Sequence, residues 1–274
     1  MGPPENISSL FASLATARVF DLAQAYEVGM PQSPNHPIYQ HSLVRRHGDV
    51  VRSDGGSAAN DWIVTGIHVG THIDALCHVS QDGLLYERVD ADSVTTAKGF
   101  TQFGIESVPP FIGRGVLLDI AALRGVEVLQ PGEAVTANDL DAACARQGVS
   151  VNRGDAVLIG TGWAQHWSDR ATYEGQLGGA PGPDPTAAEW IIDHGVRLAG
   201  GETIAFEQIV PGSGHATLPV HRRLLVDEGI NIVETLRLTE LSAAKVSEFM
   251  LVVIPLKLTG ATGSPVRPIA VVPA

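Results

Sequence analysis

Short apolar segments rich in β-branched residues recur along this chain, separated by polar segments that contain glycine, proline and aspartate. Apolar segments of four to eight residues with such boundaries are typical of strands. They predict strands at residues 18–22, 62–67, 116–120, 156–161 and 230–236. The longest apolar segment, 249–258, contains many β-branched residues, and we expect it to form a central strand.

Helix boundary signals appear between the predicted strands. Thr136 can cap a helix start, with Asp139 three residues later as its acidic partner, and Gly148 lies just beyond the expected end. Asp184 followed by Pro185 predicts a second start, because proline fits the first helical position.

The remaining segments complete an alternation of strands and short helices. Residues 220–228 favour a helix that ends at Gly229. Segments rich in proline and glycine predict irregular loops at residues 30–37 and 175–183. Strands alternating with helices indicate an α/β protein with a mixed sheet. No repeat or linker interrupts residues 1–274, so we expect one domain, with residues 1–17 as an N-terminal arm or helix.

Charge and cysteine content narrow the functional classes. The net charge of −12 argues against nucleic acid or an anionic membrane as a partner, because both require clustered basic residues. Cys77 and Cys144 are too few for a disulfide framework, and both lie among apolar residues, as small buried side chains do. The chain shows neither a signal-peptide pattern nor an apolar segment of about 20 residues, which favours a cytoplasmic protein.

The strongest chemical signal is a histidine cluster. Three of the ten histidines fall within residues 68–78, together with an aspartate. His72 and Asp74 face the same side of an extended segment, and a turn through Gly70 can bring His68 towards them. Two imidazoles and one carboxylate suit Zn²⁺, Mn²⁺ or Fe²⁺, and three protein ligands leave a position for water. The cluster therefore predicts a catalytic metal site.

Further polar residues are candidates for the same site. His78 is either another ligand or the group that carries a proton, since histidine ionises near neutral pH. Four residues in the second half of the chain are also candidates: Glu207, Gln208, His221 and Glu234.

With these residues in view, the chain resembles the cyclase family of metal-dependent hydrolases, which includes bacterial kynurenine formamidase and isatin hydrolase. The family motif HxGTHxDxPxH is matched from His68 to His78, except that Leu76 replaces the proline, which is closer to the isatin hydrolase branch. Other segments that carry the resemblance are 19–22, 29–31, 218–221, 224–226, 229–234 and 263–267.

The resemblance implies a swivelling β/β/α fold and a homodimer or larger homo-oligomer. It implies a divalent metal, Mn²⁺ in preference to Zn²⁺, bound through His68, His72 and Asp74. Formamidase relatives imply a second metal on His221 and Glu234, whereas isatin-type relatives imply one Mn²⁺ with Gln208 as a possible ligand. His78 matches the catalytic histidine of the family.

These features predict a hydrolase that opens a C–N amide bond in a small aromatic cyclic amide such as isatin. N-formylkynurenine is the alternative substrate. Aromatic residues are scarce, and those placed to line a flat pocket are Trp62, Trp163 and Phe206.

Two other classes remain as alternatives. A non-haem iron oxygenase would bind iron through two histidines and one carboxylate, here His72, His221 and Asp74. Arg237 and Thr239 would then bind 2-oxoglutarate. That interpretation leaves His68 and His78 without roles. A metal-binding or sensor protein without catalysis would instead bind the metal with no open position.

Overall fold

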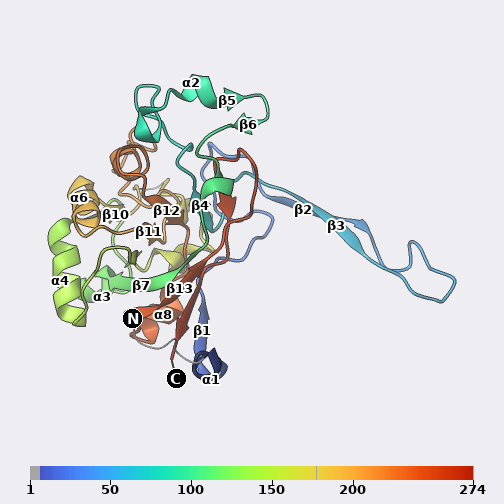
Figure 1. The fold of residues 1–274 in the computed structure, drawn as a ribbon, viewed down its shortest axis with the longest axis horizontal. Coiled ribbons are helices and arrows are strands. Elements are labelled where there is room, and N and C mark those ends of the chain that lie inside the picture. The colour runs from blue at the N-terminus through green and yellow to red at the C-terminus, as the bar shows by residue number, and fades with distance from the viewer. Residues whose placement is uncertain (1–6, 177, 274) are drawn as a thin grey trace.

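The computed structural model describes residues 7–176 and 178–273 and is built around one large mixed sheet (Figure 1). Within these residues nine strands form this sheet. In spatial order they are β1 (Arg18–Asp21), β15 (Ile269–Val272), β13 (Glu248–Val253), β7 (Phe111–Asp119), β9 (Ala156–Gly160), β11 (Leu198–Gly201), β12 (Asn231–Glu234), β4 (His72–Asp74) and β14 (Gly263–Pro265). β7, β9, β11 and β12 run parallel, and the other pairs are antiparallel.

Short elements surround the sheet. The two-stranded pairs are β2 (Gln40–Arg45) with β3 (Asn60–Val64), β5 (Thr95–Thr96) with β6 (Gly99–Phe100), and β8 (Ala134–Val135) with β10 (Gly182–Pro183). The α-helices are α1 (Ile7–Thr16), α2 (Ala91–Val94), α3 (Ile120–Arg124), α4 (Ala137–Gln147), α5 (Arg170–Tyr173), α6 (Pro185–Asp193), α7 (Pro219–His221) and α8 (Thr239–Ala243). The other helical segments are the 3₁₀ turns η1 (Tyr86–Arg88), η2 (Ile105–Ser107) and η3 (Trp163–His166), and the π-helix η4 (Arg222–Asp227).

The strands bury both of their faces because successive side chains point to opposite sides. Leu117 and Leu158 belong to one hydrophobic cluster, which also contains residues of β13 and α8. Val116 and Val157 belong to a second cluster, which is covered by residues of α4 and α6. The mixed sheet with few short helices confirms the predicted α/β fold class.

Local capping signals predicted the helix boundaries well. Thr136 and Asp139 form a reciprocal capping box at the start of α4, and Gly148 ends the helix in the left-handed conformation. Asp184 caps α6 through the backbone N–H groups of Thr186 and Ala187. Of the predicted N-terminal arm or helix, residues 7–16 are helical, and residues 1–6 lie outside the described residues. No described helix is long and apolar enough to cross a bilayer.

Two strand predictions needed correction. The strand predicted for 249–258 ends at Val253, because Pro255 lacks the N–H that would continue the sheet. This strand, β13, lies near one end of the sheet and not at its centre, and its side chains are fully buried on one face only.

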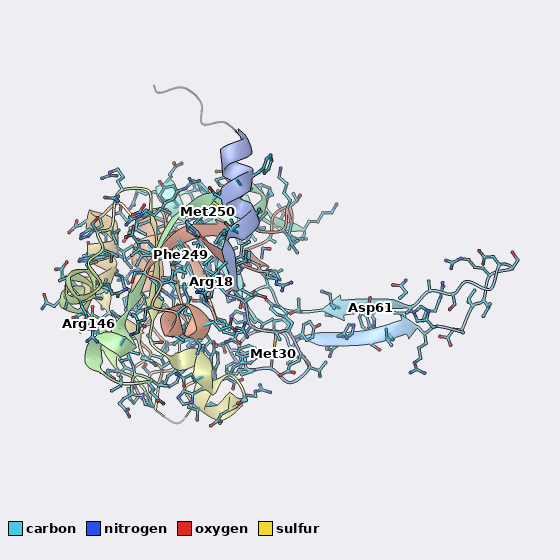
Figure 2. The ribbon with its side chains drawn as sticks, turned by 90° about the horizontal axis from the view of Figure 1, so that it is seen from below. Arg18, Met30, Asp61, Arg146, Phe249 and Met250 are labelled. Carbon is cyan, nitrogen blue, oxygen red and sulfur yellow. The ribbon has the colours of Figure 1, made fainter. Side chains whose placement is uncertain are left out.

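The strand predicted for 62–67 is β3, which ends at Val64 and lies in a hairpin that projects from the body of the molecule (Figures 1 and 2). We call residues 40–64, which include both hairpin strands, the arm. Every residue of β2 and β3 is exposed, so the apolar side chains of this hairpin are not buried within the described part of the chain.

Candidate metal centre

The glycine turn of the motif is fixed by a tyrosine behind it. Gly70 has a φ of 62°, and a Cβ there would lie 2.5 Å from the ring of Tyr26. The Tyr26 hydroxyl lies 2.8 Å from the carbonyl oxygen of Val69 and 2.7 Å from that of Thr71, and donates to them. Both the backbone conformation and the contact therefore require glycine at position 70.

The sheet register places a histidine beside a glutamate. β4 pairs with β12 so that His72 lies opposite Glu234. The Nδ1–H of His72 donates to the Gly70 carbonyl oxygen at 2.8 Å, which leaves Nε2 with a free lone pair. Nε2 lies 3.3 Å from Glu234 Oε2 and has no hydrogen-bond partner among the described residues.

A second buried pair adjoins this one. His221 Nε2 lies 2.9 Å from Glu234 Oε1 and 3.7 Å from Asp74 Oδ2. Glu207 Oε1 accepts from the His221 backbone N–H at 2.8 Å and from Nδ1 at 2.6 Å. Glu207 thus orients the ring of His221 so that Nε2 faces the carboxylates.

Asp74 lies between two groups of possible ligands. Its Oδ1 is 2.8 Å from His68 Nδ1, and the other His68 nitrogen lies 2.8 Å from the Thr262 hydroxyl. The His78 ring stacks on that of His68, with a centroid distance of 3.6 Å. Two sets each offer ligand atoms within 4.8 Å of one another: His68, Asp74 and His78, and His72, Asp74 and Glu234. The geometry therefore fits one ion or two.

The charges of the cluster favour cation binding. Burial raises the pKa of Asp74, but the imidazoles of His78, His68 and His72 outweigh it and hold that pKa below its usual range. Burial and Asp74 likewise raise the pKa of Glu234, and His221 and His72 bring it below its usual value. Both carboxylates are thus ionised at neutral pH.

A divalent metal fits this centre by its donor chemistry. Within residues 7–176 and 178–273, His72 Nε2 and Asp74 Oδ2 are buried polar atoms without a hydrogen-bond partner, and both face the same group of carboxylates and imidazoles. Unpaired buried polar atoms are costly, so such atoms indicate a bound species. Mixed imidazole and carboxylate donors suit Mn²⁺ and Zn²⁺.

Seven of the predicted site residues come together, and four do not. The cluster contains His68, His72, Asp74, His78, His221 and Glu234, and Glu207 joins it through its contact with His221. Gln208 donates instead to the carbonyl oxygen of Gly132 at 2.7 Å. Trp163 and Phe206 are fully buried in hydrophobic clusters, and Trp62 lies on the arm, half exposed. No described contact joins these four residues to the cluster, so their predicted roles stay predictions.

Two histidines beside the cluster were not predicted from the sequence. The His36 ring lies 5.4 Å from that of His68, and burial and the nearby His68 and His72 lower its pKa. Burial also lowers the pKa of His215, which is close enough to Glu234 and His221 to be affected by their charges. Both come from loops without metal-ligand spacing, and only the fold brings them near the centre.

Comparison with known proteins agrees with this geometry. A family described as "Putative cyclase" matches residues 20–208. An isatin hydrolase from Roseibium aggregatum is 28% identical over 224 residues, covering 81% of this chain and 78% of that protein. A kynurenine formamidase from Sphingopyxis alaskensis is 26% identical over 259 residues, covering 92% and 97%. A crystal structure described as a novel cyclase superposes with a TM-score of 0.85 at 32% identity, covering 98% of this chain and 91% of that one.

Proposed function

This chain belongs to the putative cyclase family, and from that premise we propose that it is a metal-dependent hydrolase that opens the C–N bond of a small cyclic amide. One observation carries the proposal: His72 Nε2 and Asp74 Oδ2 are buried beside Glu234 and His221, and neither atom has a hydrogen-bond partner in the part of the chain that the structure describes. A group of this kind has the donors that a hydrolytic metal needs.

A divalent ion bound there supplies a water that ionises near neutral pH and a positive charge that polarises a carbonyl oxygen. The residues of the chain hold this arrangement in place. The Gly70 carbonyl orients His72, Glu207 orients His221, and Thr262 holds His68. The three rings are thereby fixed before a substrate arrives, which lowers the cost of reorganisation during the reaction.

His78 is the candidate for proton transfer. Among the described residues, neither ring nitrogen of His78 takes part in a hydrogen bond, and burial lowers its pKa to about 3, so the free ring is neutral at neutral pH. In the reaction, a water oxygen bonds to the carbonyl carbon and the C–N bond breaks. A ring nitrogen of His78 accepts the proton released by the water and returns it to the departing nitrogen.

The substrate that we propose is an aromatic cyclic amide of the isatin type. Two observations support it: Leu76 in place of the motif proline, and the similarity to an isatin hydrolase over 81% of the chain. N-formylkynurenine is the second candidate, supported by the similarity to a kynurenine formamidase over 92% of the chain.

The test is hydrolysis of both compounds by metal-free protein and by protein reloaded separately with Mn²⁺ and Zn²⁺, followed by ultraviolet absorbance. We expect isatin to be consumed only by metal-loaded protein. His72→Ala should abolish this activity and metal retention together, whereas His47→Ala, an exposed histidine on the arm, should retain both. Metal-dependent turnover of N-formylkynurenine alone would favour the second candidate. Turnover without metal would contradict a metal-dependent hydrolase.

A further inference from the structure

A second cavity lies on the chain, lined by none of the candidate metal ligands. It has a volume of about 410 Å³ and is formed where the chain leaves β1, β12 and β14. Its polar lining consists of Asp21, Gln24, Arg237 and Arg267. Ligand sites in proteins have volumes of about 300–1,000 Å³, so this cavity is large enough for a small molecule.

Gln24 contributes a buried amide donor to the cavity. The residue is 6% exposed, and its Nε2 has no hydrogen-bond partner among the described residues. Its backbone is fixed, because the N–H donates to Thr71 Oγ1 at 2.8 Å and that hydroxyl donates to the Thr235 carbonyl oxygen at 2.6 Å. A buried amide without a partner is costly, so the Gln24 side chain indicates a bound acceptor.

Arg237 contributes a second donor of the same kind. Its Nε is buried and lacks a hydrogen-bond partner within the described ranges of the chain. Its Nη2 lies 2.9 Å from Glu240 Oε1, and the Glu240 side chain is 61% exposed, so water screens that charge. A guanidinium has five N–H donors, and one exposed carboxylate therefore leaves Nε for another acceptor.

The charges that line the cavity favour an anion. Arg267 donates to Asp21 Oδ2 from Nε at 2.9 Å and from Nη2 at 2.7 Å, which compensates the charge of this carboxylate. The lining thus carries two positive charges, on Arg237 and Arg267, against one negative charge on Asp21. The whole chain carries a net charge of −12, so this local excess of positive charge is opposite to the general charge of the protein.

The shape of the donors and the nature of the walls indicate which anion fits. Amide and guanidinium groups are planar, and their N–H groups match the two oxygens of a carboxylate. Ala23, Ala25 and Val266 add apolar walls to the same cavity. A carboxylate attached to a small apolar group covers these walls, whereas inorganic phosphate leaves them in contact with water.

We propose that this cavity binds a small carboxylate with an apolar body, which accepts hydrogen bonds from Gln24 Nε2 and Arg237 Nε. Because both donor atoms are buried, the long Arg237 side chain, which is 40% exposed, adjusts as the ligand enters. The proposal does not depend on the reaction at the metal centre.

Benzoate is the probe, and calorimetric titration of the full chain measures its binding with and without Mn²⁺. Asp74 and Glu234 are ionised, so the metal-free centre repels benzoate and leaves the proposed site to be measured. We expect one benzoate to bind per metal-free chain. Benzamide, which is neutral and has the same shape, should bind at least about 10-fold more weakly.

Two substitutions test the donors separately. Arg237→Met and Gln24→Leu should each weaken benzoate binding about 10–100-fold, because hydrogen bonds to a charged group contribute at that level. Gln24→Leu keeps the backbone N–H that bonds to Thr71. The matched control is Arg223→Met, since Arg223 is also paired with a glutamate, Glu189, at 2.6 Å. Its affinity for benzoate should equal that of wild type, and circular dichroism checks that all variants are folded.

Crystals of the full chain soaked in 4-bromobenzoate locate the site directly. We expect anomalous signal from bromine in the cavity beside Arg237. Signal at the metal centre alone, benzoate binding that requires Mn²⁺, or wild-type affinity in a folded Arg237→Met variant would overturn the proposal. Inorganic phosphate that binds as tightly as benzoate would contradict the carboxylate class of ligand.

Discussion

Glu207 Oε1 accepts two hydrogen bonds from His221, one from the backbone N–H at 2.8 Å and one from ring Nδ1 at 2.6 Å. Glu207 is 1% exposed, and His221 presents its other nitrogen to Glu234 at 2.9 Å. A carboxylate in this position fixes the tautomer of the ring and increases its basicity. The neighbouring residue, Gln208, is directed to a different part of the structure.

Removing the charge of Glu207 should weaken metal binding. We expect Glu207→Gln to lower the affinity for Mn²⁺ about 10–100-fold, because outer partners of a metal-bound histidine contribute at that level. The measurement is a competition titration against a chelator, which does not depend on activity. Gln208→Ala is the matched control and should change the affinity little. A larger loss in the Gln208 variant would instead support the sequence-based assignment of Gln208 as a ligand.

Replacing His78 should separate catalysis from metal binding. If His78 carries the proton, His78→Ala lowers kcat by about 10²–10⁴-fold, the usual contribution of a general acid–base residue. The metal content of the purified variant should stay at the wild-type level. Metal analysis decides the matter, since a loss of metal along with activity would make His78 a ligand in the group with His68 and Asp74.

The glycine opposite Asp74 on β14 should not tolerate a side chain. A Cβ on Gly263 would lie 2.6 Å from the Ile73 carbonyl oxygen and 2.9 Å from His68 Cε1. We expect Gly263→Ala to displace β4 or His68 and to destabilise the protein by about 1–3 kcal/mol, as overpacking does. Chemical denaturation and metal titration should both register the change.

The control for this substitution is Gly160→Ala in β9, where the nearest atom is Leu117 Cδ1 at 3.3 Å. A flexible leucine end can move by a few tenths of an ångström, so this variant should bind metal normally. Equal effects in the two variants would mean that Gly263 has no special relation to the metal centre.

Glu202 should make stability depend on pH. Burial raises its pKa from 4.5 to about 6, despite hydrogen bonds from Thr161 and Gly162. The folded state therefore favours the protonated carboxyl. Its stabilising contribution is complete below pH 4.5 and is lost as the pH rises through 6, an effect of about 2 kcal/mol.

Denaturant unfolding of wild type and Glu202→Gln across pH 4 to 7 tests this sign. As the pH rises, the free energy of unfolding of Glu202→Gln should increase relative to that of wild type, because the amide does not ionise. Glu127 is an exposed glutamate that lines the same surface cavity as Glu202, and the stability of Glu127→Gln should follow that of wild type across this pH range. A wild-type advantage that grows with pH would show that the hydrogen bonds to the carboxylate outweigh its burial.

Local signals in the sequence were sufficient to predict two helix starts and part of the histidine cluster. The capping box of Thr136 and Asp139 and the proline start of α6 are contacts between residues close in the chain, so the sequence determines them. The spacing of His72 and Asp74 on β4 predicted their common side in the same way. The metal cluster was therefore recognisable before any tertiary contact was known.

Only the tertiary structure decided which later residues reach the cluster. Phe206 has a φ of 53°, and after this residue the side chain of Glu207 contacts His221 while that of Gln208 contacts Gly132. Sequence spacing could not separate these two neighbours, because their partners, His221 and Gly132, lie far from them in the chain and only the fold brings them close. His36 joins the site through loop packing, for which no periodic pattern exists.

In the arm, too, the sequence determined the local structure and only the fold determined its surroundings. The apolar segment at residues 62–67 predicted a strand, and a strand is present at Asn60–Val64. An apolar segment of this length indicates a strand, but it does not identify the surface that its side chains pack against. The sequence by itself thus determined the local elements and the chemistry of the metal motif, and the three-dimensional fold alone decided which distant side chains complete the centre and which apolar surfaces stay uncovered.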